Sequence, residues 1–310
     1  MTPAAWSTRL AIVLSTALFL CMASAALGQR GYPPKLEGAR ERVYKTVGDA
    51  QLKLWIFPPK DHQATDARPA IVFFFGGGWT NGSPQQFEQH CRYLASRGMV
   101  AITADYRVAS RQQVKAVDCV RDAKSAVRWI RSHAGELGVD PTRIAAGGGS
   151  AGGHIAACAG TIEGFDPAGE DAQVSSRPDA LVLFNPVVSF DPGLAESKDG
   201  RVTGLANRMG VEPTALSPAN HVDAGDPPTL ILIGTKDFLI EGNRQFAQRM
   251  QAAGVRCELD LYESRTHGFF NYGRDGDKDF RATLASADRF LASLGWIEGE
   301  PTVEKVFGAE

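Results

Sequence analysis

The chain has 310 residues, in which 33 lysine and arginine residues face 35 aspartate and glutamate residues, for a formal net charge of −2 at pH 7. This near-equality of basic and acidic residues argues against a nucleic-acid partner, because proteins that bind nucleic acids need a basic surface to hold phosphates. The length beyond the N-terminal segment is enough for one α/β domain with a large hydrophobic core.

Residues 1–28 have the pattern of a secretory signal peptide. A single charge, Arg9, precedes an apolar run over Leu10–Leu20, and small residues follow at 23–26. The run is short for a membrane span, so we expect a secreted or periplasmic protein without a stable membrane anchor once the signal is removed. A retained anchor is the alternative. Cys21 follows a leucine rather than a small residue, which argues against lipidation.

Residues 29–41 have the composition of a polar N-terminal arm, and beyond them apolar strands alternate with amphipathic helices. Ala70–Phe75 is continuously apolar, as a strand buried on both faces of a sheet should be. Over Val114–His133, apolar residues recur at helical spacing. The pattern predicts strands over 52–57, 70–75, 99–104, 144–147, 180–185, 230–234 and 257–262, and helices over about 87–96, 114–133, 150–160, 242–253 and 277–294.

Alternation of this kind predicts an α/β fold with a mostly parallel central sheet and helices on both faces. We expect one catalytic domain over residues 42–297 and a C-terminal tail over 298–310. Residues 161–178 and 189–219 lack strong periodicity, and we expect them to shape a pocket above the sheet.

Four cysteines follow the signal segment, and none has the C-x-x-C or cysteine–histidine spacing that binds zinc. We therefore expect no metal site. An exported protein can hold disulfides, and Cys91 and Cys119 fall on two predicted helices that flank one strand. A disulfide between them is one interpretation, and two packed free thiols are the other. Cys158 lies among small residues, which is typical of a buried thiol.

The segment Gly148-Gly149-Ser150-Ala151-Gly152 lies where a predicted strand ends and a predicted helix begins. A sharp turn from strand to helix presses the neighbours of the serine against other backbone, and glycine relieves those clashes. The hydroxyl is then exposed near a helix N-terminus, where N–H groups favour a developing negative charge. We interpret Ser150 as a nucleophile. The alternative is a glycine-rich turn with an incidental serine.

A serine nucleophile needs a general base, and the base needs a carboxylate that orients it. In a sheet of this kind the acid and then the histidine follow the serine, each just after a later strand. Asp237 comes directly after the strand over 230–234, and His267 lies in the loop after the strand over 257–262. Either residue alone could be an ordinary loop residue. Their order and positions together predict a triad of Ser150, His267 and Asp237.

Other candidates fit this arrangement less well. His154 lies on the same predicted helix as Ser150, and we interpret it as structural. His221 has no strand end to present it, and Asp226 precedes a strand, at the wrong edge of the sheet. Glu241 is the one rival to Asp237.

Gly76-Gly77-Gly78-Trp79 also follows a buried strand. Acyl transfer passes through a tetrahedral oxyanion, and each backbone N–H aimed at it lowers the barrier by about 3 kcal/mol. We assign the oxyanion hole to the N–H groups of Gly77 or Gly78, together with that of Ala151. A tight turn without a catalytic role is the alternative. Trp79 is either a substrate-binding pocket wall or a packing residue.

These segments, together with Asp105-Tyr106-Arg107 and His267-Gly268-Phe269, resemble the α/β-hydrolase superfamily over roughly residues 42–295. In particular the chain is similar to hormone-sensitive-lipase-like esterases and to bacterial acetyl-xylan and feruloyl esterases. The resemblance implies the α/β-hydrolase fold and a serine esterase that needs no cofactor. Many relatives have histidine where this chain has Phe75, and hormone-sensitive-lipase relatives have aspartate where it has Gly149. These departures favour the carbohydrate-esterase side of the resemblance.

We therefore expect a secreted serine esterase that acts on a small-molecule or oligosaccharide ester and removes acetyl groups from carbohydrates. A feruloyl or general short-chain carboxylesterase is one alternative. A serine peptidase or amidase is another, and a non-catalytic binding protein on the same fold is a third. In the expected reaction, Ser150 attacks the ester carbonyl and His267 transfers the protons, and water then hydrolyses the acyl-enzyme. The oligomeric state is left open.

Overall fold

The computed structural model describes residues 31–191 and 201–308. The predicted signal peptide over residues 1–28 lies outside the described residues. The chain divides into two compact units, Met1–Lys35 and Leu36–Glu310, and the second unit holds every strand and helix named below.

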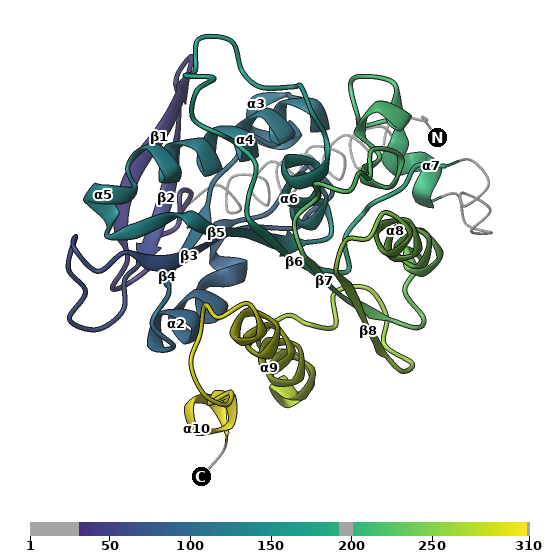
Figure 1. Ribbon diagram of the computed structural model, residues 1–310. Coiled ribbons are helices and arrows are strands. Elements are labelled where there is room, and N and C mark those ends of the chain that lie inside the picture. The colour runs from purple at the N-terminus through teal and green to yellow at the C-terminus, as the bar shows by residue number, and fades with distance from the viewer. Residues whose placement is uncertain (1–30, 192–200, 309–310) are drawn as a thin grey trace, which may run out of the picture. The chain divides into compact units, whose positions relative to one another are not determined.

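An eight-stranded sheet forms the centre of the unit Leu36–Glu310 (Figure 1). Its strands are β1 (Arg40–Val47), β2 (Ala50–Phe57), β3 (Arg68–Phe74), β4 (Val100–Ala104), β5 (Val139–Gly149), β6 (Ala180–Phe184), β7 (Thr229–Gly234) and β8 (Cys257–Tyr262). They lie in the order β1-β2-β4-β3-β5-β6-β7-β8. β2 pairs antiparallel with β1 and β4, and all other neighbours pair in parallel. The predicted mostly parallel sheet is therefore confirmed.

Helices cover both faces of this sheet, as the sequence predicts (Figure 1). On one face lie α4 (Ala116–Ser132), α6 (Ala151–Thr161) and α8 (Ile240–Ala252), and on the other lie α2 (Glu88–Ser96) and α9 (Lys278–Ser293). The shorter elements are α3 (Ala109–Gln112), α5 (Ala134–Leu137), α7 (Arg201–Ala206), α10 (Val303–Phe307) and the 3₁₀ turns Pro84–Phe87, Pro213–Leu216, Pro218–Asn220 and Asp275–Asp277.

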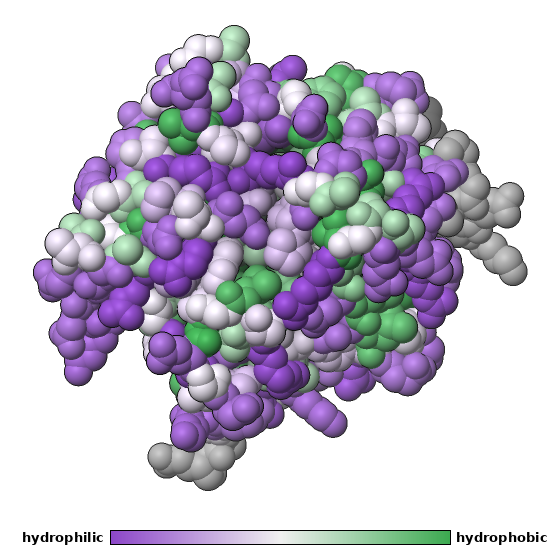
Figure 2. Space-filling view, in the orientation of Figure 1, coloured by the Kyte–Doolittle hydropathy of each residue, from purple (hydrophilic) through white to green (hydrophobic). Residues whose placement is uncertain are grey.

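Two hydrophobic clusters, one on each face, explain why the central strands are continuously apolar. Side chains alternate between the faces along a strand, and every residue of β4, β6 and β7 is buried. Figure 2 shows what remains outside on one face of the molecule, where hydrophilic residues predominate and apolar residues occur in small separate groups. No helix in the described ranges is both long and apolar enough to cross a membrane.

The edge strand β1 is absent from the sequence-based prediction, which placed Arg40 and Glu41 in the N-terminal arm. Of its eight residues only Tyr44 is buried. Edge strands carry exposed charges that protect them from pairing with other chains, and those charges hide the alternation that marks a strand. The sheet therefore begins two residues before the predicted domain boundary at 42.

The predicted C-terminal tail over 298–310 contains α10, which packs on the domain. Val303 is buried, and the ring of Phe307 meets the ring of Phe280 edge-on at 5.1 Å between centroids. The N–H of Thr302 donates to the hydroxyl of Tyr93 at 2.9 Å. With five residues, α10 is too short to show helical periodicity in the sequence.

Cys91 and Cys119 are free thiols, so the disulfide interpretation is wrong. The chain enters β4 from β3 and leaves it towards β5, and both of these strands lie on the same side of β4, so the chain reverses its direction across the sheet at β4. Because both crossovers are right-handed, this reversal places α2, before β4, and α4, after it, on opposite faces of the sheet. The two cysteines belong to the separate clusters on those faces. Burial raises the pKa of both thiols and of Cys158, so all three are unreactive.

Candidate active site

The three predicted triad residues follow three different strands. Ser150 directly follows β5, Asp237 follows β7 and His267 follows β8. These strands run parallel, so their carboxyl ends meet at one edge of the sheet, where ligands bind in open α/β sheets. Residues that lie 117 and 30 positions apart in the chain are thereby brought into contact.

The side chains of these residues form an unbroken hydrogen-bonded series. Nε2 of His267 lies 2.8 Å from Oγ of Ser150, and Nδ1 of His267 lies 2.9 Å from Oδ2 and 3.1 Å from Oδ1 of Asp237. The Asp237 side chain is fully buried, whereas the His267 side chain is 29% exposed. With its proton on Nδ1, the imidazole can donate to the carboxylate and accept the serine proton through Nε2.

The backbone of Ser150 is strained in the way a nucleophile at a strand-to-helix turn requires. Its φ of 53° and ψ of −115° fall outside the regions that L-residues favour, at a cost of order 1–3 kcal/mol. Its N–H donates to the carbonyl of Phe184 at 2.9 Å, which holds the turn. A Cβ on Gly152 would lie 2.0 Å from the carbonyl oxygen of Phe74. Glycine is therefore needed there, as the sequence predicts.

The acid and the base are each held by neighbouring groups. The N–H of Leu239 donates to Oδ1 of Asp237 at 3.0 Å, and the ring of Phe238 packs 4.9 Å from the ring of His267. The N–H of Gly268 donates to Oδ1 of Asn185 at 3.0 Å. Sequence reasoning missed the role of Asn185, since nothing in the local pattern distinguishes it from any residue at a strand end.

The glycine loop lies against Ser150. A Cβ on Gly76 would be 3.5 Å from Cβ of Ser150, and Gly77 has a φ of 126°, which only glycine adopts readily. No described residue accepts a hydrogen bond from the N–H of Gly77 or Gly78. Ala151 is the first residue of α6, where N–H groups have no partner within the helix. The assignment of these three N–H groups to an oxyanion hole stays a prediction.

The side chain of Trp79 packs among aromatic rings. Its side chain is 1% exposed, and its ring lies 5.0 Å from that of His154 and 6.3 Å from that of Phe190. This burial favours the packing interpretation, and a substrate-binding role of Trp79 stays a prediction. A local pattern could not decide this, because the contacts come from distant parts of the chain.

His154 is structural, as the sequence predicts. It is fully buried, and its Nε2 donates to the carbonyl of Leu216 at 2.8 Å. Burial lowers the pKa of His154 to about 4, so the ring is neutral near pH 7.

The remaining rivals are all engaged elsewhere. Asp226 accepts a hydrogen bond from Arg177 at 2.6 Å, before β7 rather than after it. Glu241 forms an ion pair with Arg244 at 3.1 Å near the surface. His221 lies 3.3 Å from a backbone carbonyl. None of them contacts Ser150 or His267 in the described part of the chain.

Residues 201–219, the later part of the segment 189–219, reach the site, while the expectation that this segment shapes a pocket stays a prediction. Nη1 of Arg208 donates to the carbonyl of Gly78 at 3.0 Å. The guanidinium of Arg201 lies 4.6 Å above the ring of Phe238, which itself packs on His267. This segment therefore borders both the glycine loop and the histidine.

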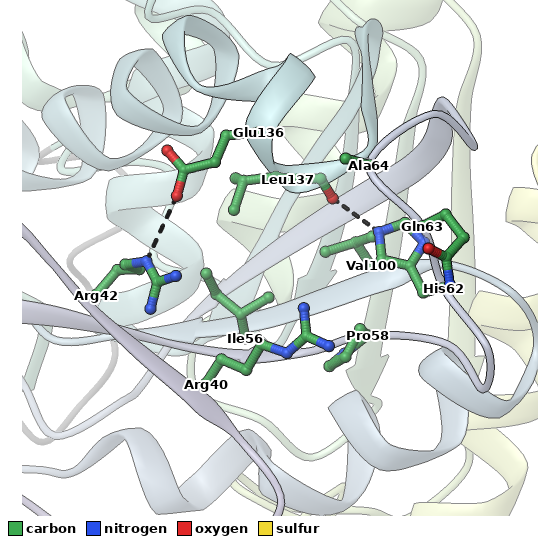
Figure 3. Close-up of a pocket in the computed structure, with 10 residues that line it drawn as sticks. All are labelled: Arg40, Arg42, Ile56, Pro58, His62, Gln63, Ala64, Val100, Glu136 and Leu137. Atoms are coloured by element: carbon green, nitrogen blue, oxygen red, sulfur yellow. Dashed lines mark hydrogen bonds and ion pairs between the residues drawn. The ribbon is translucent and has the colours of Figure 1, made fainter.

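A cavity of about 380 Å³ lies away from these residues, near the amino ends of β4 and β5. Figure 3 shows Arg42 directed at Glu136, at 3.7 Å, and His62 directed at the carbonyl of Leu137, at 2.8 Å. No serine or cysteine is among its lining residues. Across the described ranges, no group of three or more histidine, cysteine, aspartate and glutamate residues is placed to hold a metal ion.

Comparisons with known proteins agree with this fold. A family model described as alpha/beta hydrolase fold matches residues 71–271. The chain is 29% identical over 276 residues to carboxylesterase NlhH of Mycobacterium tuberculosis, which covers 81% of this chain and 82% of that protein. It is 31% identical over 202 residues to the probable carboxylic ester hydrolase LipM of the same species, covering 61% of this chain and 45% of that protein.

A solved structure is more similar still. The apo form of Thermogutta terrifontis esterase 2 is 50% identical in sequence, with a TM-score of 0.82, and the match covers 87% of this chain and 99% of that one. Other structures of that esterase hold propionate or butyrate, or are phosphonylated by sarin.

Proposed function

The chain belongs to the α/β-hydrolase family and is a carboxylic ester hydrolase, and we propose that Ser150, His267 and Asp237 carry out its reaction as a catalytic triad. The observation that carries this proposal is the hydrogen-bonded series from Oγ of Ser150 through His267 to the buried carboxylate of Asp237. The phosphonylation of the similar esterase by sarin supports it, because such reagents attach to an activated nucleophile.

In the first half of the proposed reaction, Oγ of Ser150 attacks the ester carbonyl carbon while Nε2 of His267 takes the hydroxyl proton. Asp237 holds the proton on Nδ1 and stabilises the imidazolium that forms. The N–H groups of Gly77 or Gly78 and of Ala151 stabilise the oxyanion. When the tetrahedral intermediate collapses, the bond to the leaving oxygen breaks and His267 gives its proton to the alcohol.

The second half repeats these steps with water in place of the serine. His267 takes a proton from water as the water oxygen attacks the acyl-enzyme carbonyl. The second tetrahedral intermediate expels Oγ of Ser150, which regains a proton from His267. The products are one carboxylic acid and one alcohol, and the enzyme returns to its starting state.

The proposed substrates are esters of short acyl groups. The bound propionate and butyrate of the similar esterase support this acyl length. We further propose export of the protein and acetylated carbohydrates as its natural substrates, on the signal-like composition of residues 1–28 and on the resemblance to acetyl-xylan esterases. A general short-chain carboxylesterase is the second candidate, favoured by the same bound acids.

Hydrolysis of p-nitrophenyl esters from acetate to decanoate, by the purified protein and by Ser150→Ala, tests the proposal. We expect turnover of acetate to butyrate, a steep fall for the longer esters, and loss of all activity in the variant. Acetylated xylan is then compared with p-nitrophenyl acetate for acetate release. Full activity of Ser150→Ala would overturn the triad, and release from the small ester alone would favour the second candidate.

A further inference from the structure

The two loops that flank Ser150 are not held together by the sheet. The glycine loop follows β3 and the histidine loop follows β8, and three strands, β5, β6 and β7, lie between them. Strands are spaced by about 4.8 Å, so the two strand ends lie about 19 Å apart along the sheet. Both loops must reach inward over the sheet to meet at Ser150, beyond the reach of the ladder hydrogen bonds.

Two side-chain amides join these loops. Oε1 of Gln86 accepts the N–H of Gly76 at 2.6 Å. Nε2 of Gln86 donates to Oδ1 of Asn271 at 2.7 Å, and Nδ2 of Asn271 donates to the carbonyl of Gly268 at 2.8 Å. Each amide accepts on one side and donates on the other, so the hydrogen bonds run from donor to acceptor in one direction, from the glycine loop to the histidine loop. Gln86 and Asn271 are called the amide bridge below.

The amide bridge ends on residues that adjoin the reacting groups. A Cβ on Gly76 would lie 3.5 Å from Cβ of Ser150, and Gly76 precedes Gly77, whose N–H is assigned to the oxyanion hole. Gly268 directly follows His267, and its N–H is held by Asn185 while its carbonyl is held by Asn271. The bridge engages the N–H of Gly76 alone and leaves the N–H groups of Gly77 and Gly78 free for the oxyanion.

We propose that the amide bridge sets the distance between the oxyanion-hole N–H groups and the imidazole of His267, so that Gln86 and Asn271 are positioning residues for the reaction. The proposal rests on the proposed triad. A misplacement of about 1 Å between reacting groups can cost about 100-fold in rate. The glycine loop and the histidine loop must therefore be held at a fixed separation, and the hydrogen bonds of the sheet do not hold them.

The donor and acceptor pattern of the bridge suggests variants that break one link each. Gln86→Glu keeps an acceptor for the N–H of Gly76 but, once its carboxyl is ionised, has no donor for Oδ1 of Asn271. Asn271→Asp keeps the acceptor for Gln86 but loses the side-chain donor to the carbonyl of Gly268, which keeps only the longer hydrogen bond from the backbone N–H of residue 271 at 3.4 Å. Gln86→Ala removes both links of Gln86. Gln85→Ala is the matched control, because the Gln85 side chain is exposed and makes no hydrogen bond with the described residues.

The test measures kcat and KM for p-nitrophenyl butyrate, and inhibition by a trifluoromethyl ketone that forms an oxyanion when a serine adds to it. We expect Gln86→Ala, Gln86→Glu and Asn271→Asp to lower kcat by about 10-fold to 100-fold, with KM nearly unchanged. Inhibitor affinity should fall by the same factor as kcat, because both depend on the oxyanion. Gln85→Ala should match the wild-type protein.

The double variant Gln86→Ala with Asn271→Ala separates a bridge from two independent structural residues. Within a bridge the second substitution adds almost nothing to the first, whereas independent sites add their effects. Additive losses, or a change in KM alone, would overturn the proposal. So would a kcat of the single variants equal to that of Gln85→Ala. Ser150→Ala is assayed beside them: if it remains active the proposed triad fails, whereas an inactive Ser150→Ala beside fully active bridge variants refutes the bridge alone.

Discussion

The sheet has a histidine–aspartate pair at each of its two edges, His267 with Asp237 at the carboxyl edge and His62 with Asp66 at the amino edge. The two pairs differ in the hydrogen-bond partner of the second ring nitrogen of the histidine. His267 contacts Asp237 through Nδ1 and the hydroxyl of Ser150 through Nε2. At the amino edge, Nδ1 of His62 lies 3.2 Å from Oδ2 of Asp66, but Nε2 donates to the carbonyl of Leu137 at 2.8 Å. A carbonyl has no proton to give, so this second pair has nothing to activate.

The two pairs also differ in the surroundings of the carboxylate. The Asp237 side chain is fully buried and serves one histidine and one backbone N–H. The Asp66 side chain is 20% exposed and is shared between His62 and Arg68. A histidine–aspartate contact is therefore not by itself a catalytic signature. What distinguishes the carboxyl edge is a hydroxyl held on the other side of the ring by a strained backbone.

Removing that hydroxyl has the largest expected effect. Ser150→Ala should lower kcat for p-nitrophenyl butyrate by about 10⁵-fold or more, because the acyl-enzyme cannot form. Near-wild-type thermal unfolding would show that the fold is intact. A variant that kept measurable turnover sensitive to His267→Ala would point to a different nucleophile beside the same base.

Replacing the two carboxylates compares the edges directly. Asp237→Asn should lower kcat by about 10⁴-fold, because an amide can stabilise the wrong imidazole tautomer. Asp66→Asn makes the same chemical change in the other pair, and we expect kcat to stay within about 2-fold of wild type because nothing there reacts. Equal losses of kcat in the two variants would show that Asp66 supports the reaction as much as Asp237 does.

The same glycine substitution at the two edges should act in opposite directions on stability. A Cβ at Gly152 would lie 2.0 Å from a carbonyl oxygen, whereas a Cβ at Gly135, in α5 beside the amino-edge cavity, meets nothing within 4 Å. Gly152→Ala should cost about 3 kcal/mol or more of unfolding free energy, while Gly135→Ala should stabilise by up to about 1 kcal/mol. Urea unfolding of both variants measures the contrast, and a stable Gly152→Ala contradicts it.

A third histidine, His90, extends the comparison to a ring with no polar partner. Neither of its ring nitrogens has a hydrogen-bond partner among the described residues, and its ring lies among those of Phe87, Phe184 and Phe280. Burial lowers the pKa of His90 from 6.5 to about 3. As the pH falls from 6.5 towards 3, His90 binds a proton in the unfolded chain but stays neutral in the folded chain. The free energy of unfolding therefore decreases over that pH range.

At pH 5 this loss amounts to about 2 kcal/mol for one group. His90→Phe should remove it, so that the difference in unfolding free energy between pH 8 and pH 5 becomes smaller than in the wild-type protein. His90→Leu serves as a second variant if the larger ring is not accommodated. An unchanged pH difference in both variants would mean that His90 takes up no proton on unfolding.

The smallest expected effect belongs to His62→Gln. Glutamine can still donate to the carbonyl of Leu137, and no reacting group is lost. We expect kcat and the pH dependence of activity to stay within about 2-fold of wild type. A shifted pH profile would show that the amino edge is coupled to the reaction.

Much of this protein could be predicted from the sequence because local rules sufficed. Continuous apolar runs predicted the central strands, since strands covered on both faces need no polar residues. Ser150, Asp237 and His267 each follow such a strand. The carboxyl ends of parallel strands share one edge of the sheet, so the sequence predicts that these three residues lie close together. The glycine at 152 was expected from the geometry of the turn alone.

The tertiary structure decided what depends on contacts between distant residues. β1 is an edge strand whose charges conceal its period, and Trp79 is buried by residues that follow it much later in the chain. Cys91 and Cys119 are separated by the sheet itself. Gln86 and Asn271 stand 185 positions apart, and no local pattern marks a glutamine whose role is to meet an asparagine. Such contacts exist only after folding brings the two loops together over Ser150.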